Sequence, residues 1–388
     1  MTRRRILTGL AVLILLALLG FFGIVPAYVE GSMNKVVATN LPEITPAARA
    51  LHASLAIADM HADTLLWRRS LLDEAARGQV DLPRLQSGNV ALQILSSVTK
   101  TPKGQNYDAN GADSDNITLL TVAQLQPPRT WSSLLERSLY HAEKLRSAEA
   151  ASEGRLRIVR SGADVRRLLA DRAAGRKVTG TMLSIEGLQN LEGRLENVAR
   201  LHAAGFRMAG VAHFFDNEVG GSMHGVAKGG LTPFGRQVIR EMEARGMIVD
   251  IAHASPAAVA DILAMARRPL VSSHGGVQTT CKVNRNLSDP QIRAVAATGG
   301  LIGIGYWDAA VCGTSPTAIA AAIAHVRGIA GIDHVALGSD FDGAVTTGFD
   351  TAGLVNITQA LADRGFTEAE IAAVMGGNLL RLLSTQLP

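Results

Sequence analysis

Several short apolar runs in this sequence end in a histidine or a carboxylate. Four of the ten histidines stand at such ends, namely His61, His213, His253 and His274. Three carboxylates hold similar places, namely Asp63, Glu186 and Asp340. Imidazole nitrogen and carboxylate oxygen are common ligands of zinc, and the same groups move protons in hydrolytic sites. Their shared position predicts metal-dependent hydrolytic chemistry.

His61 and Asp63 stand two residues apart in the segment DMHAD. In a strand, residues i and i+2 point to the same side, so both side chains can reach one ion. A polar strand end without function is the simpler interpretation of this pair alone. Glu186 ends an apolar run, where a carboxylate is costly unless it is paired or bound to a cation. Its two oxygens suit a bridge between two ions about 3.5–4 Å apart, although a surface glutamate fits the same pattern.

His253 and His274 close the runs MIVDIAH and PLVSSH. Either histidine alone is explained by a place in the core or on the surface. Together with His61, Asp63 and Glu186, they make five ligand-type residues at four strand ends, which packing does not readily explain. These five residues are therefore the predicted metal ligands.

Two acids and one arginine complete the candidate chemistry. Asp340 and Asp342 follow the last candidate strand in the segment GSDFDG, and one of them could act as general base and acid. A turn acid or a helix cap is the simpler interpretation, and we prefer it for Asp342. Arg285 lies eleven residues after His274 on the following loop. Its permanent charge suits a substrate carboxylate, although a lone loop arginine is usually solvated.

The elements that must position these residues alternate along the chain. Candidate strands cover residues 55–60, 89–98, 179–185, 208–212, 247–252, 269–273, 300–306 and 334–339. Candidate helices cover residues 131–150, 191–204, 232–245, 255–266, 289–298 and 316–328, and residues 99–126 are expected to form a long loop. This alternation predicts an α/β fold with a single (β/α)8 barrel, in which the carboxyl ends of the strands share one face.

The composition excludes several classes of protein. The chain has 388 residues, 47% of them hydrophobic, which rules out a disordered protein. A formal charge of +4 is too small and too scattered for a nucleic-acid binder. Cys281 and Cys312 are the two cysteines, so the chain is neither a disulfide scaffold nor a cysteine-based zinc module. Whether these two cysteines pair is left open.

The first thirty residues have the character of a membrane segment. Arg3, Arg4 and Arg5 precede an uncharged run over residues 6–29, which is long enough to span a bilayer as a helix. Arginines before such a helix predict a cytoplasmic N-terminus, with the rest of the chain on the extracytoplasmic (periplasmic or extracellular) side. A cleaved signal peptide is the alternative. The predicted division is an anchor and linker over residues 1–39 and a catalytic barrel over residues 40–388.

The ordered segments resemble the renal (membrane) dipeptidase family of zinc peptidases, within the amidohydrolase-like barrels. In order they are DMHAD, VDLPRLQSG, SIEG, AHFFDNE, GMIVDIAH, VSSH, the pair Arg285-Asn286, GSDFDG and GGNLLRLL. They span about residues 55–383, and their order and number make the combination specific. The loop over residues 214–230 resembles that of bacterial members. The N-terminal anchor departs from the best-known members, which a C-terminal lipid anchor holds.

The resemblance implies a role for each candidate residue. His61 and Asp63 are similar to the ligands of a first zinc, His253 and His274 are similar to the ligands of a second zinc, and Glu186 is similar to the carboxylate that bridges the two. Asp340 is similar to the acid that handles the proton of a bridging hydroxide. His213 and Arg285 are similar to the groups that hold the substrate's carbonyl and carboxylate. The implied activity is hydrolysis of dipeptides with two Zn²⁺ ions, the metal-bridging hydroxide attacking the scissile carbonyl.

Three properties stay open at this level. A related amidohydrolase that acts on N-acyl amino acids or lactones would use the same metals and is the alternative function. The side chains and the L or D configuration that the substrate site prefers are not readable, nor is the resident metal in the cell. A homodimer is expected by analogy with the family alone.

Overall fold

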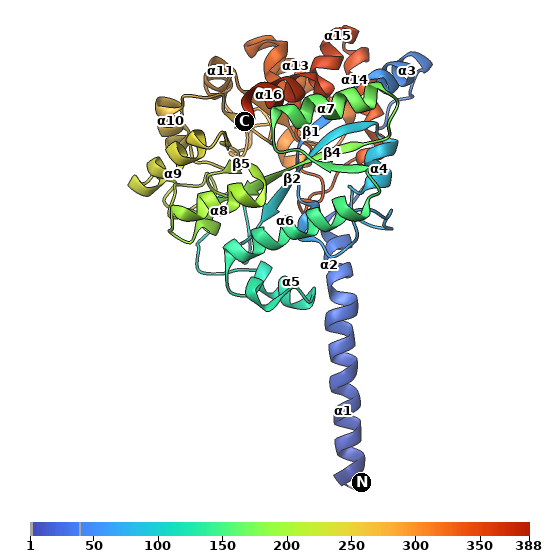
Figure 1. Ribbon diagram of the computed structural model, residues 1–388, viewed down its shortest axis with the longest axis vertical. Helices are drawn as coiled ribbons and strands as arrows, with labels where there is room; N and C mark the ends of the chain where they lie inside the picture. Colours follow the sequence, from blue (N-terminus) through green and yellow to red (C-terminus); the bar gives the residue numbers. More distant parts are fainter. Residues whose placement is uncertain (1–2, 39) are drawn as a thin grey trace.

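The computed structural model describes residues 3–38 and 40–388, and Figure 1 shows a body of helices and strands from which one long helix projects. Among the described residues, the body contains nine strands. They are β1 (Ile57–Ala62), β2 (Val90–Val98), β3 (Leu156–Ile158), β4 (Thr179–Glu186), β5 (Phe206–Gly210), β6 (Ile248–Asp250), β7 (Val271–Ser272), β8 (Leu301–Ile304) and β9 (Val335–Leu337). Each of the eight predicted strands overlaps one of these, so the predicted alternation is confirmed.

Eight of the strands close into a parallel barrel. Their order is β2-β1-β9-β8-β7-β6-β5-β4, and β4 returns to pair with β2 over residues 180–186. The strand β3 was not predicted; it pairs with the first residues of β4, whereas β5 pairs with later residues of β4. Three residues are too few to show an alternating pattern. The closed parallel barrel confirms the predicted (β/α)8 class.

Helices surround the barrel (Figure 1). Those of the body are α3 (Pro46–Ser54), α4 (Leu82–Ser87), α5 (Ile117–Ala123), α6 (Leu134–Ala151), α7 (Gly162–Ala173), α8 (Glu196–Ala204), α9 (Pro233–Ala244), α10 (Pro256–Met265), α11 (Asp289–Ala297), α12 (Asp308–Val311), α13 (Pro316–Ala330), α14 (Val355–Asp363), α15 (Glu368–Ala372) and α16 (Asn378–Gln386). Thr232 and Ser255 cap α9 and α10, each accepting a backbone N–H three residues later.

Two predicted boundaries need correction. The helix expected over residues 191–204 begins only at Glu196, because Glu192 and Gly193 take positive φ values of 50° and 70° and interrupt it. The segment 99–126, expected to be a loop, contains the short helix α5. α5 packs its apolar residue Ile117 against Trp67 and Val98, and this packing is not readable from local sequence.

The barrel interior is filled by apolar side chains from the strands. Met60, Met182 and Met208 belong to a buried cluster that also contains Leu379 and Leu383 of α16. α16 therefore closes the amino-terminal end of the barrel. The opposite end, where the strands finish, is left for polar side chains, as in other barrels of this type.

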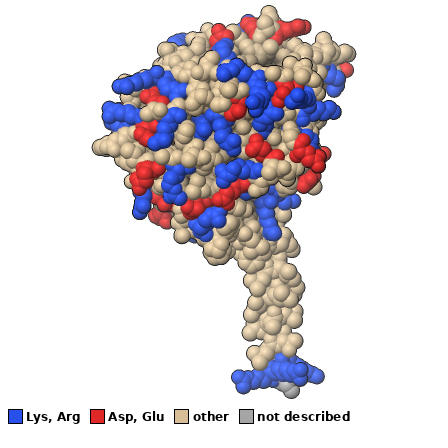
Figure 2. All heavy atoms as spheres, in the orientation of Figure 1, with Lys and Arg blue, Asp and Glu red and all other residues tan. Residues whose placement is uncertain are grey.

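The projecting rod is formed by the N-terminal residues. α1 (Arg3–Leu19), a π-helical turn (Gly20–Ile24) and α2 (Val25–Met33) make one apolar helix of 31 residues with a mean hydropathy of 2.7 in its best window. Its length and composition suffice to cross a membrane, and a signal sequence has the same properties. Figure 2 shows an uncharged shaft with basic side chains at its free end, where Arg3, Arg4 and Arg5 are exposed.

Candidate metal centre

The predicted site residues lie together at the carboxyl end of the barrel. His61 is within β1 and Asp63 directly follows it, while Glu186 is the last residue of β4. The others follow β5, β6, β7 and β9 by two or three residues, and they are His213, His253, His274 and Asp340. All seven side chains are buried. Parallel strands thus deliver these groups to one point, as the sequence predicted.

Two of these residues have an unusual backbone conformation. His253 and Asp340 have φ values of 62° and 61°, in the left-handed region that costs about 1 kcal/mol or more for a residue with a Cβ. Gly343 would bring a Cβ to 2.0 Å from Asp340 Oδ1, so only glycine fits beside this carboxylate. The surrounding packing therefore fixes where the two side chains point.

Glu186 is at the centre of the cluster. Its Oε1 atom lies 3.0 Å from His253 Nε2, 3.2 Å from His274 Nε2 and 3.5 Å from His213 Nε2. His61 Nε2 is 3.8 Å from the same oxygen. One carboxylate thus faces four imidazoles that come from four different strand ends. Imidazole nitrogens and a carboxylate oxygen grouped in this way can be ligands of a metal cation.

The donor atoms divide into three overlapping groups. His61, Glu186 and His274 form one, Glu186, His213 and His253 form another, and His61, Asp63 and Asp340 form the third, with all ligand atoms of a group within 4.8 Å of one another. Glu186 and His61 each belong to two groups. His213, which the sequence analysis assigned to substrate, therefore lies as close to Glu186 as a ligand would.

Burial and mutual repulsion disturb the pKa values of the acids. Burial, followed by the neighbouring Asp63 charge, raises the pKa of Glu186 well above its usual value. Burial raises the pKa of Asp340 to about 8, and Asp63 adds to the rise. For His61, burial favours the neutral ring, but Asp63, Glu186 and Asp340 outweigh it and raise the pKa to about 10. Three carboxylates in one buried site thus call for positive charge.

The other imidazoles are held neutral. Burial lowers the pKa of His213 to about 3 and lowers those of His253 and His274 well below the usual value. A neutral imidazole keeps a free lone pair, which is the form that binds a metal. Burial therefore prepares these rings as ligands.

Unpaired polar atoms show that the residues fit metal cations. Among the described residues, His61 Nε2 and Asp63 Oδ1 face each other across 3.5 Å and are buried without a hydrogen-bond partner. Each unpaired buried polar atom costs about 1–3 kcal/mol. A divalent cation would accept these lone pairs and would also offset the carboxylate charges. The donor set of histidine and carboxylate suits zinc.

Other buried acids hold the strand ends in place. Asp59 Oδ1 accepts hydrogen bonds from the backbone N–H of His61 at 3.0 Å and from Ser339 Oγ at 3.0 Å. Asp342, expected as a turn acid or helix cap, is buried, accepts Thr64 Oγ1 at 2.8 Å and caps no helix among the described residues. Asp342 therefore has a structural role, as expected, but it stabilises the loop after β1 instead of capping a helix.

Arg285 lies beside the cluster on the loop after β7. It is buried, its Nη2 donates to His274 O at 2.8 Å, and the same nitrogen is 3.3 Å from His253 Nε2. Its guanidinium lies 5.8 Å from the ring centre of Trp307, whose Nε1 donates to Tyr107 Oη at 3.1 Å. Arg285 is therefore held by backbone and aromatic contacts rather than solvated on its loop.

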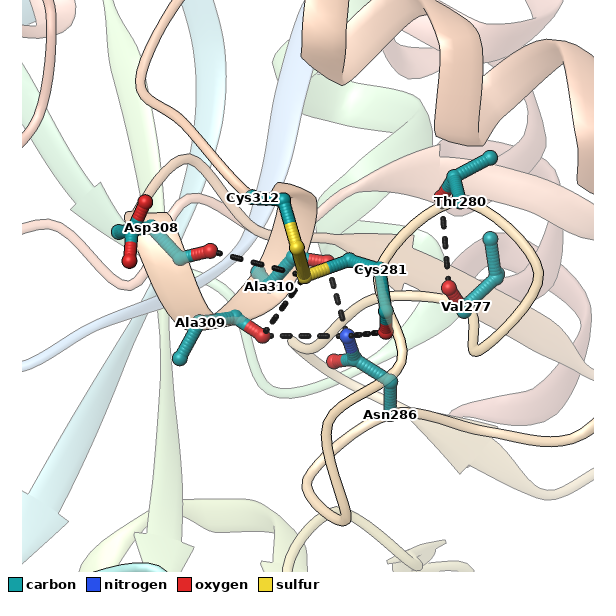
Figure 3. The surroundings of a disulfide bond; sticks show 8 residues. All are labelled: Val277, Thr280, Cys281, Asn286, Asp308, Ala309, Ala310 and Cys312. Atoms are coloured by element: carbon teal, nitrogen blue, oxygen red, sulfur yellow. Dashed lines mark hydrogen bonds between the residues drawn. A yellow bond between two sulfur atoms is a disulfide. The ribbon is translucent and has the colours of Figure 1, made fainter.

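A disulfide bond anchors this loop. Cys281 and Cys312 are bonded, which answers the question that the sequence left open (Figure 3). Asn286 Nδ2 donates to Cys281 O at 2.8 Å and to Ala310 O of α12 at 3.0 Å. The loop that carries Arg285 is thus tied to α12, which directly follows Trp307.

The cluster opens into a cavity of about 580 Å³. Asp63, Glu186, His213, His253, Arg285 and Asp340 are on its wall. Sequence reasoning missed Tyr107 and Trp307, which also line it, and His224, which stacks on Phe214 with ring centres 4.7 Å apart. All three come from loops, where spacing carries no periodic signal. The cavity is large enough for a small ligand of several residues.

Comparison with known proteins identifies the family. Residues 46–387 match the model of the membrane dipeptidase family, peptidase family M19. The chain belongs to this family. It is a metallo-dipeptidase, and its family's enzymes are metal-dependent. The resemblance drawn from the sequence segments is confirmed.

Individual relatives agree with this assignment. An uncharacterised protein encoded in the pqqA 5′ region of Klebsiella pneumoniae is 33% identical over 254 residues, which is 62% of this chain and 92% of that protein. The dipeptidase aclJ of Aspergillus oryzae is 28% identical over 349 residues, 84% of this chain and 77% of that protein.

Solved structures share the fold. The probable dipeptidase PvdM of Pseudomonas aeruginosa superposes with a TM-score of 0.74 at 20% identity, over 87% of this chain and 97% of that one. A metallopeptidase of Rhodobacter sphaeroides, bound to a phosphinate mimic of the dipeptide L-Ala-D-Ala, gives 0.72 at 22% identity, over 86% of this chain and 99% of that one.

Proposed function

We propose that the protein hydrolyses dipeptides with two zinc ions held at the carboxyl end of the barrel. The observation that carries the proposal is the position of Glu186, whose Oε1 lies 3.0–3.8 Å from four imidazole nitrogens. Three buried carboxylates, Glu186 among them, and the unpaired Nε2 of His61 support a double positive charge. The family assignment supports the choice of dipeptides.

Five residues would hold the ions. His61 and Asp63 would hold the first, His253 and His274 would hold the second, and Glu186 would serve both. When bound, the zinc ions supply Lewis acidity and bring the pKa of a bound water from 15.7 toward about 7. Asp59 keeps the His61 backbone in register through its hydrogen bond of 3.0 Å. The ligands are thus positioned before any metal arrives.

The remaining residues handle substrate and proton. Asp340, whose pKa burial raises to about 8, accepts the proton of the attacking water and returns it to the departing amine. His213 lies 3.5 Å from Glu186 and holds the scissile carbonyl oxygen, where negative charge develops. Arg285 binds the free carboxylate of the second residue, which limits the site to short substrates.

Metal analysis and turnover test this proposal together. Glu186→Gln and His253→Ala are compared with wild type for zinc content and for hydrolysis of Ala-Ala. His325→Ala is the matched control, because His325 pairs with Asp289 on the surface, away from the site. We expect about two zinc ions per wild-type and control chain, less metal in both site variants, and loss of their turnover. Wild-type turnover without bound metal would sink the proposal.

Hydrolysis of N-acyl amino acids or lactones is the second candidate. The cavity wall contains many apolar residues, among them Val98, Ile117 and Leu120, which suits an acyl chain. The same metals would serve. Turnover of a panel of L,L and L,D dipeptides, N-acyl amino acids and lactones separates the two candidate functions. If N-acyl amino acids or lactones are preferred over dipeptides, the second candidate is correct.

We further propose that residues 1–39 form an uncleaved anchor and linker, with the barrel of residues 40–388 on the extracytoplasmic side. The uncharged helix after Arg3, Arg4 and Arg5 supports this orientation. The disulfide supports it independently, because disulfides persist mainly outside the reducing cytoplasm. A C-terminal alkaline phosphatase fusion should be active, and an inactive one would contradict the orientation. Light scattering in detergent tests the expected homodimer.

A further inference from the structure

The end of the N-terminal helix is fixed on the barrel rather than merely linked to it. Glu30 of α2 is buried and accepts Arg69 Nε at 2.6 Å and Arg77 Nε at 2.7 Å. Arg68 Nη1 donates to the Phe22 carbonyl at 2.9 Å. Just beyond α2, Asn34 Oδ1 accepts the backbone N–H of Ala344 at 2.8 Å, in the loop that follows Asp340. Polar contacts along about three helical turns therefore set the position of this helix end.

The same helix end lines the cavity of the metal centre. Phe21, Val25, Val29 and Met33 are on the cavity wall together with Glu186 and Asp340. Val29 packs against a buried apolar group that contains Trp67, Val98 and Ile117. The helix therefore completes an apolar wall that begins at the ends of β1 and β2 and continues through α5.

This wall lies across the barrel mouth from Arg285. In the barrel order, β7 is four strands away from β2, which is the opposite side of an eight-stranded ring. Arg285 follows β7, whereas Trp67 follows β1 and Val98 ends β2. A dipeptide whose carboxylate is on Arg285 must direct its amino-terminal residue across the metal centre toward the apolar wall.

We propose that α2 is part of the substrate site and that the wall it completes selects dipeptides with a bulky apolar side chain on the amino-terminal residue. This rests on the proposed function, because Arg285 has to bind the carboxylate. A cavity of about 580 Å³ leaves room for such a side chain beside the peptide bond. Burial of an additional apolar side chain is worth enough to raise kcat/KM about tenfold or more.

Three dipeptides that differ in the position of a bulky side chain test this selection, with the full-length protein in detergent. kcat/KM is determined for Phe-Ala, Ala-Phe and Ala-Ala, and we expect Phe-Ala to exceed both others about tenfold in wild type. Val29→Asn places an amide on the wall and should reduce the Phe-Ala to Ala-Ala ratio to roughly 2 or below. Val29→Phe fills the same space with apolar atoms and should reduce the ratio as well, so a folding defect of one variant does not decide the result.

A neighbouring residue supplies the control. Tyr28 is on the same helix turn but is 73% exposed and does not line the cavity, so Tyr28→Asn should keep the wild-type ratio. An unchanged ratio in both Val29 variants would overturn the proposal, as would preference for N-octanoyl-alanine over every dipeptide. Absence of all dipeptide hydrolysis in wild type would instead refute the proposed function.

Discussion

At the scale of single residues, the site depends on buried charged side chains that lie close to one another. Asp63, Glu186 and Asp340 are buried within the reach of His61, and burial alone makes three carboxylates unstable. Asp340 is on the cavity wall, and burial raises its pKa to about 8. A pKa near neutrality is what proton transfer requires.

We expect Asp340→Asn to lower kcat by about 10²- to 10⁴-fold, because the amide cannot accept the proton of the attacking water. KM and zinc content should change little, since the five proposed metal ligands and Arg285 remain. Steady-state kinetics with Ala-Ala and metal analysis of the purified variant check this. A kcat within about threefold of wild type, with zinc retained, would show that another group handles the proton.

Arg285 is the second residue with a separable role. Removal of a hydrogen-bonded charge that binds an ionised partner costs about 1.5–3 kcal/mol, which corresponds to roughly 10- to 150-fold in KM. Arg285→Met should show this increase for Ala-Ala. For Ala-Ala amide, which lacks the carboxylate, wild type and variant should have similar KM values. An equal loss for the acid and the amide would instead indicate that Arg285 supports His274, to whose carbonyl it donates.

At the scale of elements, the strand ends are predictable and the loops are not. His61, Glu186, His253 and His274 follow apolar runs, and parallel strands bring such ends to one face whatever their separation in sequence. Tyr107 and Trp307 reach the cavity from loops, where tertiary contacts fix the backbone and no periodicity marks a position. Likewise β3 and α5 are too short for their pattern to be read.

The disulfide joins the β7–α11 loop to the end of α12 and so fixes two elements relative to each other. It closes a segment of 31 residues and ties the Arg285 loop to the segment after Trp307. We expect the double variant Cys281→Ala, Cys312→Ala to lose about 2–4 kcal/mol of stability and to show a higher KM with kcat retained. Denaturant unfolding and kinetics in detergent measure both.

Reducing agent provides the control for this prediction. It should reproduce the rise in KM in wild type and should have no effect on the double variant, which has no cysteine. If KM stays at the wild-type value in the double variant, Asn286 and its bonds to α12 suffice to hold the loop.

At the scale of the whole molecule, the end of the N-terminal helix and the barrel are joined by specific contacts. The sequence predicted an apolar helix followed by a linker, because local composition changes near residue 30. The structure instead places Glu30 inside the helix and buries it against two arginines of the body. No local pattern could indicate this, since Arg69 and Arg77 lie 39 and 47 residues away.

Glu30 is therefore where the union of helix and body can be tested. Without the Glu30 carboxylate, Arg69 would keep its contacts with Asp342 and the Val80 carbonyl, and we expect the Arg77 side chain to turn toward solvent. Because these partners remain, we expect Glu30→Gln to cost about 1–3 kcal/mol, less than a fully buried pair would. Glu43→Gln, at an exposed position, should cost nothing measurable.

Since Val29 is adjacent to Glu30, a loosened α2 in Glu30→Gln should also lower the Phe-Ala to Ala-Ala ratio. Wild-type stability and ratio in Glu30→Gln would mean that the Asn34 and Arg68 contacts hold the helix by themselves.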